Sequence, residues 1–293
     1  MGNDTRTLRA LLAAAVVWGA TFGGAVDVAA RGANIVPVYE GWYQNPDGTF
    51  DLFFGYFNRN WDEEVEVRIG PGNVVEPGEP DQGQPTHFYP RRSRFMFHVR
   101  VPKSFGKNEL VWTLTANGKP ERAYATLRPE YVLDKGIFQY NYGLQLGSYP
   151  DNIGPELKVD GGPLQQARVG VPLTLTAIAT DPDGKPKPSI GRPIGAGTVQ
   201  VPTAAAGLRF SWHVYRGTGS AVTFDPLQFN EWEDYREGRN SPYSPGWLTP
   251  PVPSGSTWVV QATFTEPGTY VLRALAHDGG LASIRDVTVN VSR

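Results

Sequence analysis

The stretch that decides the fold lies near the end of the chain. It reads Thr-Glu-Pro-Gly-Thr-Tyr at 265–270, His-Asp-Gly-Gly at 277–280 and Asp-Val-Thr-Val-Asn-Val at 286–291. The first segment puts Pro second and Gly third in a four-residue turn, which is the preference of a type II turn. In the last segment valines alternate with polar residues, the period of a strand with one buried face. The turn and the alternation together predict a β-sheet protein.

The whole segment 157–293 contains four more runs with a period of two, which favours strands over helices. Two positions have particular roles in sandwich folds. Tyr270 follows the turn where such folds place a tyrosine corner, and Trp212 fits the tryptophan of their core. The residues predicted to face inward are Leu173, Leu175, Ala177, Ala179, Phe210, Trp212, Val214, Trp258, Val260, Ala262, Phe264, Tyr270, Leu272, Ala274, Ala276, Val287, Val289 and Val291.

Four short motifs carry a family resemblance. They are Asp-Pro-Asp-Gly at 181–184, Ser-Trp-His-Val at 211–214, Glu-Pro-Gly-Thr-Tyr at 266–270 and Asp-Gly-Gly-Leu at 278–281. Together they resemble the turns and core positions of PKD/immunoglobulin-like β-sandwich domains of bacterial exported proteins, over about 157–291. The resemblance implies a fold and a location outside the cytoplasm, and it specifies no ligand. The first half of the chain resembles an Ig-like domain more weakly, and no catalytic family is recognised.

The segment 31–127 also has the pattern of an all-β unit, with about six strands. Aromatic-rich runs at 38–43 and 50–57 flank a strong turn signal, Asn-Pro-Asp-Gly. The Gly/Pro-rich residues 70–86 are predicted to be a loop. Asn117-Gly118 predicts a tight hairpin, because both residues tolerate positive φ. Further predictions are an alternating strand at 65–69 and a strand whose buried face holds Phe95, Phe97, Val99 and Val101.

Two segments lie outside these units. Residues 128–156 show neither the period of a strand nor that of a helix. They are predicted to form a short helical turn near 129–135 and then a linker. Residues 1–30 have two arginines, an uncharged apolar run and small residues before Arg31, which predicts a signal peptide. An uncleaved N-terminal anchor is the alternative interpretation. The fold class expected is therefore all-β, with two tandem Ig-like sandwiches behind an N-terminal signal segment.

The bulk composition narrows the partners. The chain has 293 residues, a net charge of −2 and no cysteine. A near-neutral charge gives no electrostatic reason to expect nucleic acid or an anionic membrane surface as a partner. Without cysteine the chain has no disulfides, so its stability depends on its cores. We expect a periplasmic or extracellular protein, in keeping with the signal segment.

Two long insertions interrupt the second sandwich, at 185–207 and 225–257. With alternating strand directions, both insertions and the turn at 278–280 leave the same end of the sandwich, where such folds build binding surfaces. The second insertion mixes aromatic and charged residues that suit a sugar ring or a peptide. The alternative is a satellite core that keeps a long loop compact. The candidate binding residues are Glu231, Trp232, Asp234, Tyr235, Tyr243 and Trp247.

Three aspartates are candidate calcium ligands. Asp181, Asp183 and Asp278 are expected at this same end, and carboxylate oxygens suit Ca²⁺. The alternative is that Asp-Pro and Asp-Gly form turns through hydrogen bonds to their own backbone. No other cofactor is expected.

Catalysis is not expected from the motifs. The four histidines, His87, His98, His213 and His277, lack zinc spacing, and His98 and His213 fall on outward strand faces. The cluster Arg-Arg-Ser-Arg at 91–94 is interpreted as a charged strand edge that discourages pairing between sheets. A hydrolase with an unrecognised carboxylate pair is the least favoured alternative.

The favoured hypothesis is an exported, non-catalytic binding or adhesion-type protein. Its second sandwich would present loops to a glycan or protein ligand at the cell surface. The alternative is a structural subunit or spacer of a cell-envelope assembly, with self-association as its interaction.

Overall fold

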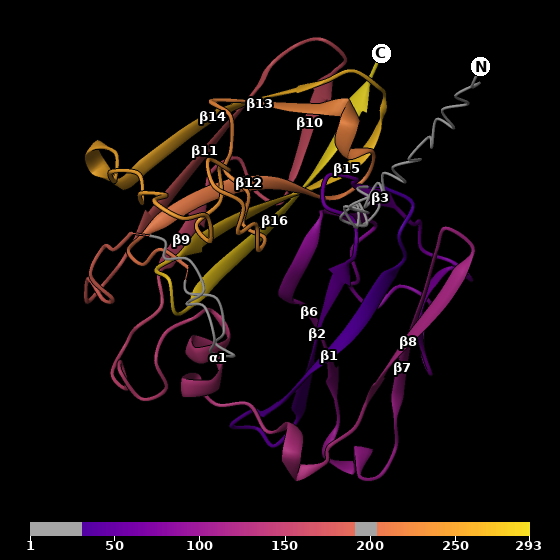
Figure 1. Cartoon of the computed structure of the whole chain (residues 1–293). Coiled ribbons are helices and arrows are strands. Elements are labelled where there is room, and N and C mark those ends of the chain that lie inside the picture. The colour runs from indigo at the N-terminus through magenta and orange to yellow at the C-terminus, as the bar shows by residue number, and fades with distance from the viewer. Residues whose placement is uncertain (1–30, 191–203) are drawn as a thin grey trace, which may run out of the picture.

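A computed structural model describes residues 31–190 and 204–293, which fold into two β-sandwiches. Figure 1 shows the two sandwiches packed directly against each other. The predicted signal segment 1–30 and most of the first insertion lie outside the described residues. Within those residues, no helix has the length and apolarity needed to cross a membrane.

The first sandwich is built from strands β1 to β8. One sheet has the order β1-β2-β6, the second has the order β4-β7-β8, and β3 pairs with β5 in a small third sheet. The strand bounds are β1 Ile35–Gln44, β2 Phe50–Asn58, β3 Val65–Glu66, β4 Asn73–Glu76, β5 His87–Phe88, β6 Arg91–Val101, β7 Leu110–Ala116 and β8 Lys119–Ala125, with a 3₁₀ turn η1 at Lys103–Phe105.

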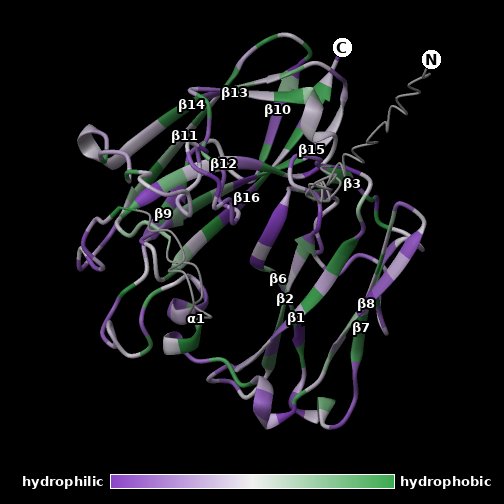
Figure 2. Ribbon diagram, in the orientation of Figure 1, coloured by the Kyte–Doolittle hydropathy of each residue, from purple (hydrophilic) through white to green (hydrophobic). Residues whose placement is uncertain are grey.

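The first core forms around aromatic side chains. Trp112, Phe54 and Phe97 are fully or almost fully buried, and the Phe54 and Phe97 rings stack with centroids 5.1 Å apart. The hairpin prediction is confirmed, because Asn117 and Gly118 both have positive φ, at 50° and 73°. Figure 2 shows hydrophobic and hydrophilic positions alternating along these strands.

Two predictions for this unit are wrong. The segment 70–86 is not a simple loop, because it contains β4, whose Asn73 amide bonds the carbonyls of Val67 and Pro85 (2.9 and 2.7 Å). The alternation predicted from Phe95 to Val101 is broken by a bulge in the β2–β6 register, and Phe95 has φ 50°. The Phe95 ring therefore leaves the core face and packs on Phe138, with centroids 4.6 Å apart.

The second sandwich has the strand order of an Ig-like domain. One sheet is β13-β14-β11-β9 and the other is β10-β16-β15-β12, with β10 parallel to β16. By position these sheets match the ABED and CFG sheets of the immunoglobulin fold. The bounds are β9 Glu156–Val159, β10 Leu164–Arg168, β11 Leu173–Thr180, β12 Arg209–Arg216, β13 Val222–Asp225, β14 Thr257–Phe264, β15 Gly268–His277 and β16 Ala282–Ser292, with 3₁₀ turns η3 at Gly219–Ala221 and η4 at Ser254–Ser256.

The predicted inward faces of this sandwich are confirmed. Trp212, Leu272 and Val289 lie in one buried cluster with the other residues of the predicted set, of which Leu173 and Trp258 are the partly buried members. The tyrosine corner is also present, because the Tyr270 hydroxyl donates a 3.0 Å hydrogen bond to the carbonyl of Glu266. The all-β, two-sandwich fold class holds for the described chain.

The segment between the sandwiches is packed against both of them. It forms a 3₁₀ turn η2 (Pro129–Tyr131) and a helix α1 (Lys135–Asn141), which Asp134 caps through the N–H of Ile137 (2.8 Å). The Tyr142 ring then meets the edge of His277 at 4.4 Å. The predicted helical turn is present, and the linker is not a free tether.

Replacing Tyr270 with Phe tests the tyrosine corner. The variant keeps the buried ring and loses the hydrogen bond to Glu266, so unfolding should cost about 1 kcal/mol less than in the native chain. Urea denaturation followed by tryptophan fluorescence measures this difference. The matched change Tyr140→Phe, at an exposed ring on α1, should leave the midpoint unchanged. Equal midpoints for both variants would contradict the assignment.

Candidate functional site

The most elaborate polar arrangement lies where the two sandwiches meet. The strands β12 and β15 bury one face in their own core, and their outward positions are covered too. Arg209, Ser211, Tyr215, Arg273 and His277 all point away from that core, yet each is at most 6% exposed. A face that looks solvent-directed in the sequence is therefore an interdomain interface.

Arg273 is the central cation of this interface. Its guanidinium forms a bidentate ion pair with Asp286 (2.7 and 2.8 Å) and stacks on the Tyr215 ring, with its carbon 3.4 Å from the ring centroid. Its third nitrogen donates to the backbone carbonyl of Met96 in the first sandwich (2.5 Å). The free-energy cost of burying this charge is offset, because the planar guanidinium has partners both at its edge and on its face.

The interface also supplies hydrogen-bond partners to the backbone of two edge strands. On β12, the N–H of Val214 donates to the Tyr89 hydroxyl (2.8 Å), and the carbonyl of Tyr215 accepts from the N–H of Thr86 (3.2 Å). On β6, the carbonyl of Met96 accepts from Arg273. Unpaired strand edges are sites of unwanted pairing, so each sandwich covers an edge of the other.

The aromatic insertion 225–257 packs into this junction. The Trp232 ring stacks on Tyr89 with centroids 4.7 Å apart and planes 16° apart. Glu231 forms an ion pair with Arg209 (3.3 Å), and burial raises the pKa of the Glu231 carboxyl although Arg209 opposes the shift. Tyr243 is buried, at 4% exposure. Of the six predicted binding residues, Glu231 and Trp232 thus contact residues outside the insertion, and Tyr243 is buried.

The other three predicted binding residues are bonded within the insertion. The Tyr235 hydroxyl donates to Glu233, and buried Asp234 forms an ion pair with Arg236 (2.7 Å). The Trp247 indole N–H donates to Asn240 (3.2 Å). The satellite-core interpretation describes these contacts, with the addition that the core is shared with the first sandwich. Ligand binding by the six residues stays a prediction.

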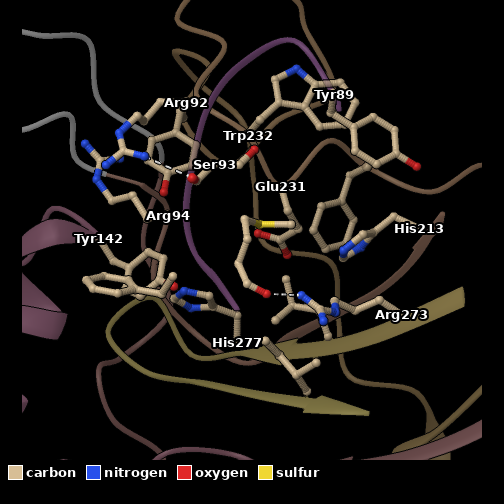
Figure 3. Close-up of a pocket in the computed structure, with 16 residues that line it drawn as sticks. Tyr89, Arg92, Ser93, Arg94, Tyr142, His213, Glu231, Trp232, Arg273 and His277 are labelled. Carbon is tan, nitrogen blue, oxygen red and sulfur yellow. Dashed lines mark hydrogen bonds between the residues drawn. The ribbon is translucent and has the colours of Figure 1, made fainter. Parts of the chain in front are cut away.

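A small cavity remains between the sandwiches, and Figure 3 shows the side chains around it. Its volume is about 60 Å³, room for a few water molecules. Glu231, Trp232 and Tyr243 line it from the insertion, His213 and His277 from β12 and β15. The cavity accommodates bound water, and it is too small for a sugar chain or a peptide.

Both cavity histidines are held neutral. Burial, reinforced by the charge of Arg273, lowers the pKa of His213 to about 3. Burial and the charge of Arg209 lower the pKa of His277 well below its ordinary value. The Nδ1 atom of His277 accepts the N–H of Gly279 (2.8 Å), so the neutral ring carries its proton on Nε2. His213 lies on the outward face of β12, as expected, and the Tyr89 ring of the first sandwich partly covers it, with ring centroids 6.0 Å apart.

The basic cluster 91–94 also has a different role from the one predicted. Arg92 forms a bidentate ion pair with Glu40 (2.7 Å to each oxygen), and Arg94 forms an ion pair with Glu233 of the insertion. The guanidinium of Arg91 lies 3.8 Å above the Trp61 ring. Arg94 therefore joins the two sandwiches, whereas the side chains of Arg91 and Arg92 find their partners within the first sandwich.

The three candidate calcium ligands form turns. Asp181 accepts the N–H of Gly184 (3.0 Å), Asp183 accepts that of Lys185 (3.1 Å), and Asp278 accepts those of Gly280 and Leu281 (2.6 and 2.7 Å). Burial raises the pKa of Asp278 to about 6. Among the described residues, no three His, Asp or Glu side chains are grouped closely enough to hold a metal ion. The turn interpretation accounts for the contacts of the three aspartates, and calcium binding by them stays a prediction.

The predicted convergence of loops at one end of the second sandwich is confirmed for their described parts. The N–H of Gly207 donates to the carbonyl of Asp278 (2.6 Å), and that of Ala205 to the carbonyl of Pro242 (2.8 Å). The Thr249 hydroxyl donates to the carbonyl of Ala206 (2.8 Å). Both insertions and the 278–280 turn thus meet there.

Sequence reasoning missed the interface residues Tyr89, Arg273 and Tyr215. One signal was available in the sequence. Outward positions of β12 and β15 carry Arg, His and Tyr, and Arg is the residue preferred over Lys for buried ion pairs and for stacking.

Comparison with known proteins adds only distant matches. No family model and no curated protein matches the sequence. Among solved structures, domains 4 and 5 of the S-layer protein SbsC match with 10% identity over 89% of this chain and 98% of that chain (TM-score 0.25). The D00-D0 domain of intimin matches with 12% identity over 89% and 100% (TM-score 0.25), and the Yersinia pseudotuberculosis adhesin InvE with 12% over 92% and 62% (TM-score 0.24). At such TM-scores these matches carry no argument about function. The Ig-like assignment rests on strand order, and the narrower PKD resemblance stays a prediction.

Replacing Arg273 with Leu tests the interface. The change removes the hydrogen bond to the carbonyl of Met96 and the stack on Tyr215, while Asp286 is exposed enough to be hydrated, so we expect a loss of about 2 kcal/mol in the free energy of unfolding. Denaturant titration measures the loss. Arg285→Leu on the neighbouring strand, where the side chain is exposed, is the matched control and should change stability little. Similar effects for the two variants would contradict a central role for Arg273.

The buried histidines predict a loss of stability in mild acid. The unfolded chain binds a proton at His213 near pH 6.5, whereas the folded chain does so only near pH 3, so acidification in this window favours unfolding. Lowering the pH from 7 to 5 should cost about 1–2 kcal/mol through this residue. Asp278 acts in the opposite direction, because its raised pKa favours proton uptake by the folded state.

Comparing variants separates these contributions. The unfolding free energy of His213→Gln, measured by urea titration from pH 7 to 5, should depend less on pH than that of the native chain. His98→Gln, at an exposed ring, should retain the native slope. A native slope in His213→Gln would show that the ring is already solvated.

Proposed function

We propose that this chain is an exported, non-catalytic structural protein whose two sandwiches form one rigid unit, serving as a spacer or subunit of a cell-envelope assembly. The observation that carries the proposal is the interface centred on Arg273. There the polar faces and open edges of both sandwiches are bonded to each other.

Three layers of contact support the rigidity. The ion pairs include Arg216 with Asp81 (2.7 and 2.8 Å) across the junction. The aromatic layer includes the Trp232–Tyr89 stack. The connecting segment adds the Asn152 amide, which donates to Asp278 (3.0 Å). A junction with polar, aromatic and covalent links resists the relative motion expected of sandwiches joined by a flexible linker.

The export part of the proposal rests on the pattern of residues 1–30. A role in ligand recognition through the second insertion has less support. Its charged and aromatic side chains already bond within the chain, as Asp234 does with Arg236 and Trp232 with Tyr89. A partner would have to break these contacts to use them.

Distance measurements between spin labels test the rigid unit. The chain has no cysteine, so labels attach only at introduced sites, such as Lys107→Cys in the first sandwich and Thr223→Cys in the second, both exposed. We expect one narrow distance distribution, as wide as that of the control pair Lys107→Cys and Lys119→Cys within the first sandwich. Expression of the full sequence in a bacterium should place the protein outside the cytoplasm.

The same labels define the contrary result. Adding Arg273→Leu to the interdomain pair should broaden the distribution while leaving the control pair narrow. A broad interdomain distribution in the native interface would overturn the rigid unit, and retention in the cytoplasm would overturn the envelope role.

A further inference from the structure

The outer face of the sheet β4-β7-β8 carries a groove that the interface does not use. The groove lies on the first sandwich, and Figure 1 shows β7 and β8 on the side remote from the second sandwich. The groove is shallow and open to solvent, with a volume of about 690 Å³. Its rim includes Pro71 and Pro77.

Strand register sets the floor of the groove. One row across the three strands is Glu76, Val111 and Tyr124, and the adjacent row is Val74, Thr113 and Arg122. Neighbouring strands lie about 4.8 Å apart, so each row spans roughly 10 Å. The alternation of β7 and β8 turns these side chains away from the core that holds Trp112 and Ala123. The floor is therefore a flat, fixed surface.

The chemistry of the floor combines an aromatic face with hydrogen-bonding groups of both kinds. The Tyr124 side chain is 54% exposed, unusually open for an aromatic residue on a strand. Glu76 and Glu109 offer acceptors, and Arg122 offers donors, at the margins of the same groove. Within residues 31–190 and 204–293, these four side chains make no hydrogen bond or ion pair. The central interface arginines are bonded instead, as Arg273 is to Asp286.

These features together point to one class of ligand. An exposed aromatic ring stacks on the C–H face of a sugar ring, and the hydroxyls of a sugar both donate to carboxylates and accept from a guanidinium. Two carboxylates disfavour an anionic ligand, and the single guanidinium keeps the groove close to neutral. An open groove, unlike a closed pocket, admits a chain that extends beyond it at both ends.

We infer that the outer face of β4-β7-β8 is a binding site for a neutral glycan chain, with Tyr124 as the stacking platform and Glu109 and Arg122 as hydrogen-bonding partners. This inference goes beyond the structural role proposed above and does not depend on it. It also differs from the glycan site predicted on the second insertion. There the aromatic rings are packed against other residues, whereas the Tyr124 ring is free to stack.

Calorimetric titration of the full chain with cellohexaose, xylohexaose and chitohexaose tests the site. At least one of these neutral oligosaccharides should bind. Tyr124→Ala should weaken that binding about tenfold or more, because it removes the stacking surface. Tyr124→Phe should retain most of the affinity, because it keeps the ring. Glu109→Gln and Arg122→Gln should each weaken binding several-fold through lost charge-assisted hydrogen bonds.

The controls keep the result interpretable. Tyr140→Ala removes a comparably exposed tyrosine (44%) on α1 and should leave affinity unchanged. All these positions are at the surface, so melting temperatures should stay close to the native value.

Three results would overturn the inference. The first is no binding of any of the three oligosaccharides at millimolar concentration. The second is binding that Tyr124→Ala does not alter. The third is a dimer, seen by sedimentation, that Tyr124→Ala abolishes, since that result would assign the face to a second copy of the chain.

Discussion

The structure depends on how two open strand edges are closed. The strands β6 and β12 each end a sheet, and each would otherwise expose a row of backbone donors and acceptors. Instead, the Tyr89 hydroxyl and the backbone of Thr86 bond β12, and Arg273 bonds the Met96 carbonyl of β6. Because each sandwich supplies the groups that the other lacks, the edges are satisfied only while the two remain together.

The polar character of the junction follows from this requirement. Backbone edges call for hydrogen-bonding side chains, and those side chains then need partners of their own once water is excluded. Arg273 has Asp286, Arg209 has Glu231, and Arg94 has Glu233. Neutral histidines complete the layer without adding charge, since burial lowers the pKa of His213 and of His277. The aromatic insertion extends the same layer through Glu231, Trp232 and Glu233, which bond to Arg209, Tyr89 and Arg94.

The strands that could be predicted from the sequence are those whose side chains alternate regularly between buried and exposed. Strand faces that bury every second residue, such as the one carrying Trp212 and the one carrying Leu272, were identified because one side of the sheet is apolar. The opposite side was misjudged, because Arg273 and His277 look like solvent-facing residues until another sandwich covers them. Short elements were also missed. The four residues of β4 are too few to show a period, and the bulge that contains Phe95 inserts two extra residues into β6 opposite β2.

The candidate sites were harder to predict for a related reason. The sequence does not distinguish an aromatic residue that stacks on a ligand from one that stacks on another side chain, as Trp232 does on Tyr89. Conversely, Tyr124 attracted no attention in the sequence, because it sits in an ordinary alternating strand. Its exposure and its neighbours across the sheet emerge only from the register of β4, β7 and β8.

The parallel pairing of β10 with β16 has a mechanical consequence. The two strands run side by side from Leu164 and Thr288 to Arg168 and Ser292. Tension that enters at the start of β10 and leaves at the end of β16 pulls them in opposite directions along their common axis. Their hydrogen bonds are then loaded in shear and must rupture together, instead of opening one at a time as in a hairpin that is unzipped. The second sandwich is thus arranged to bear a load along the direction of the chain.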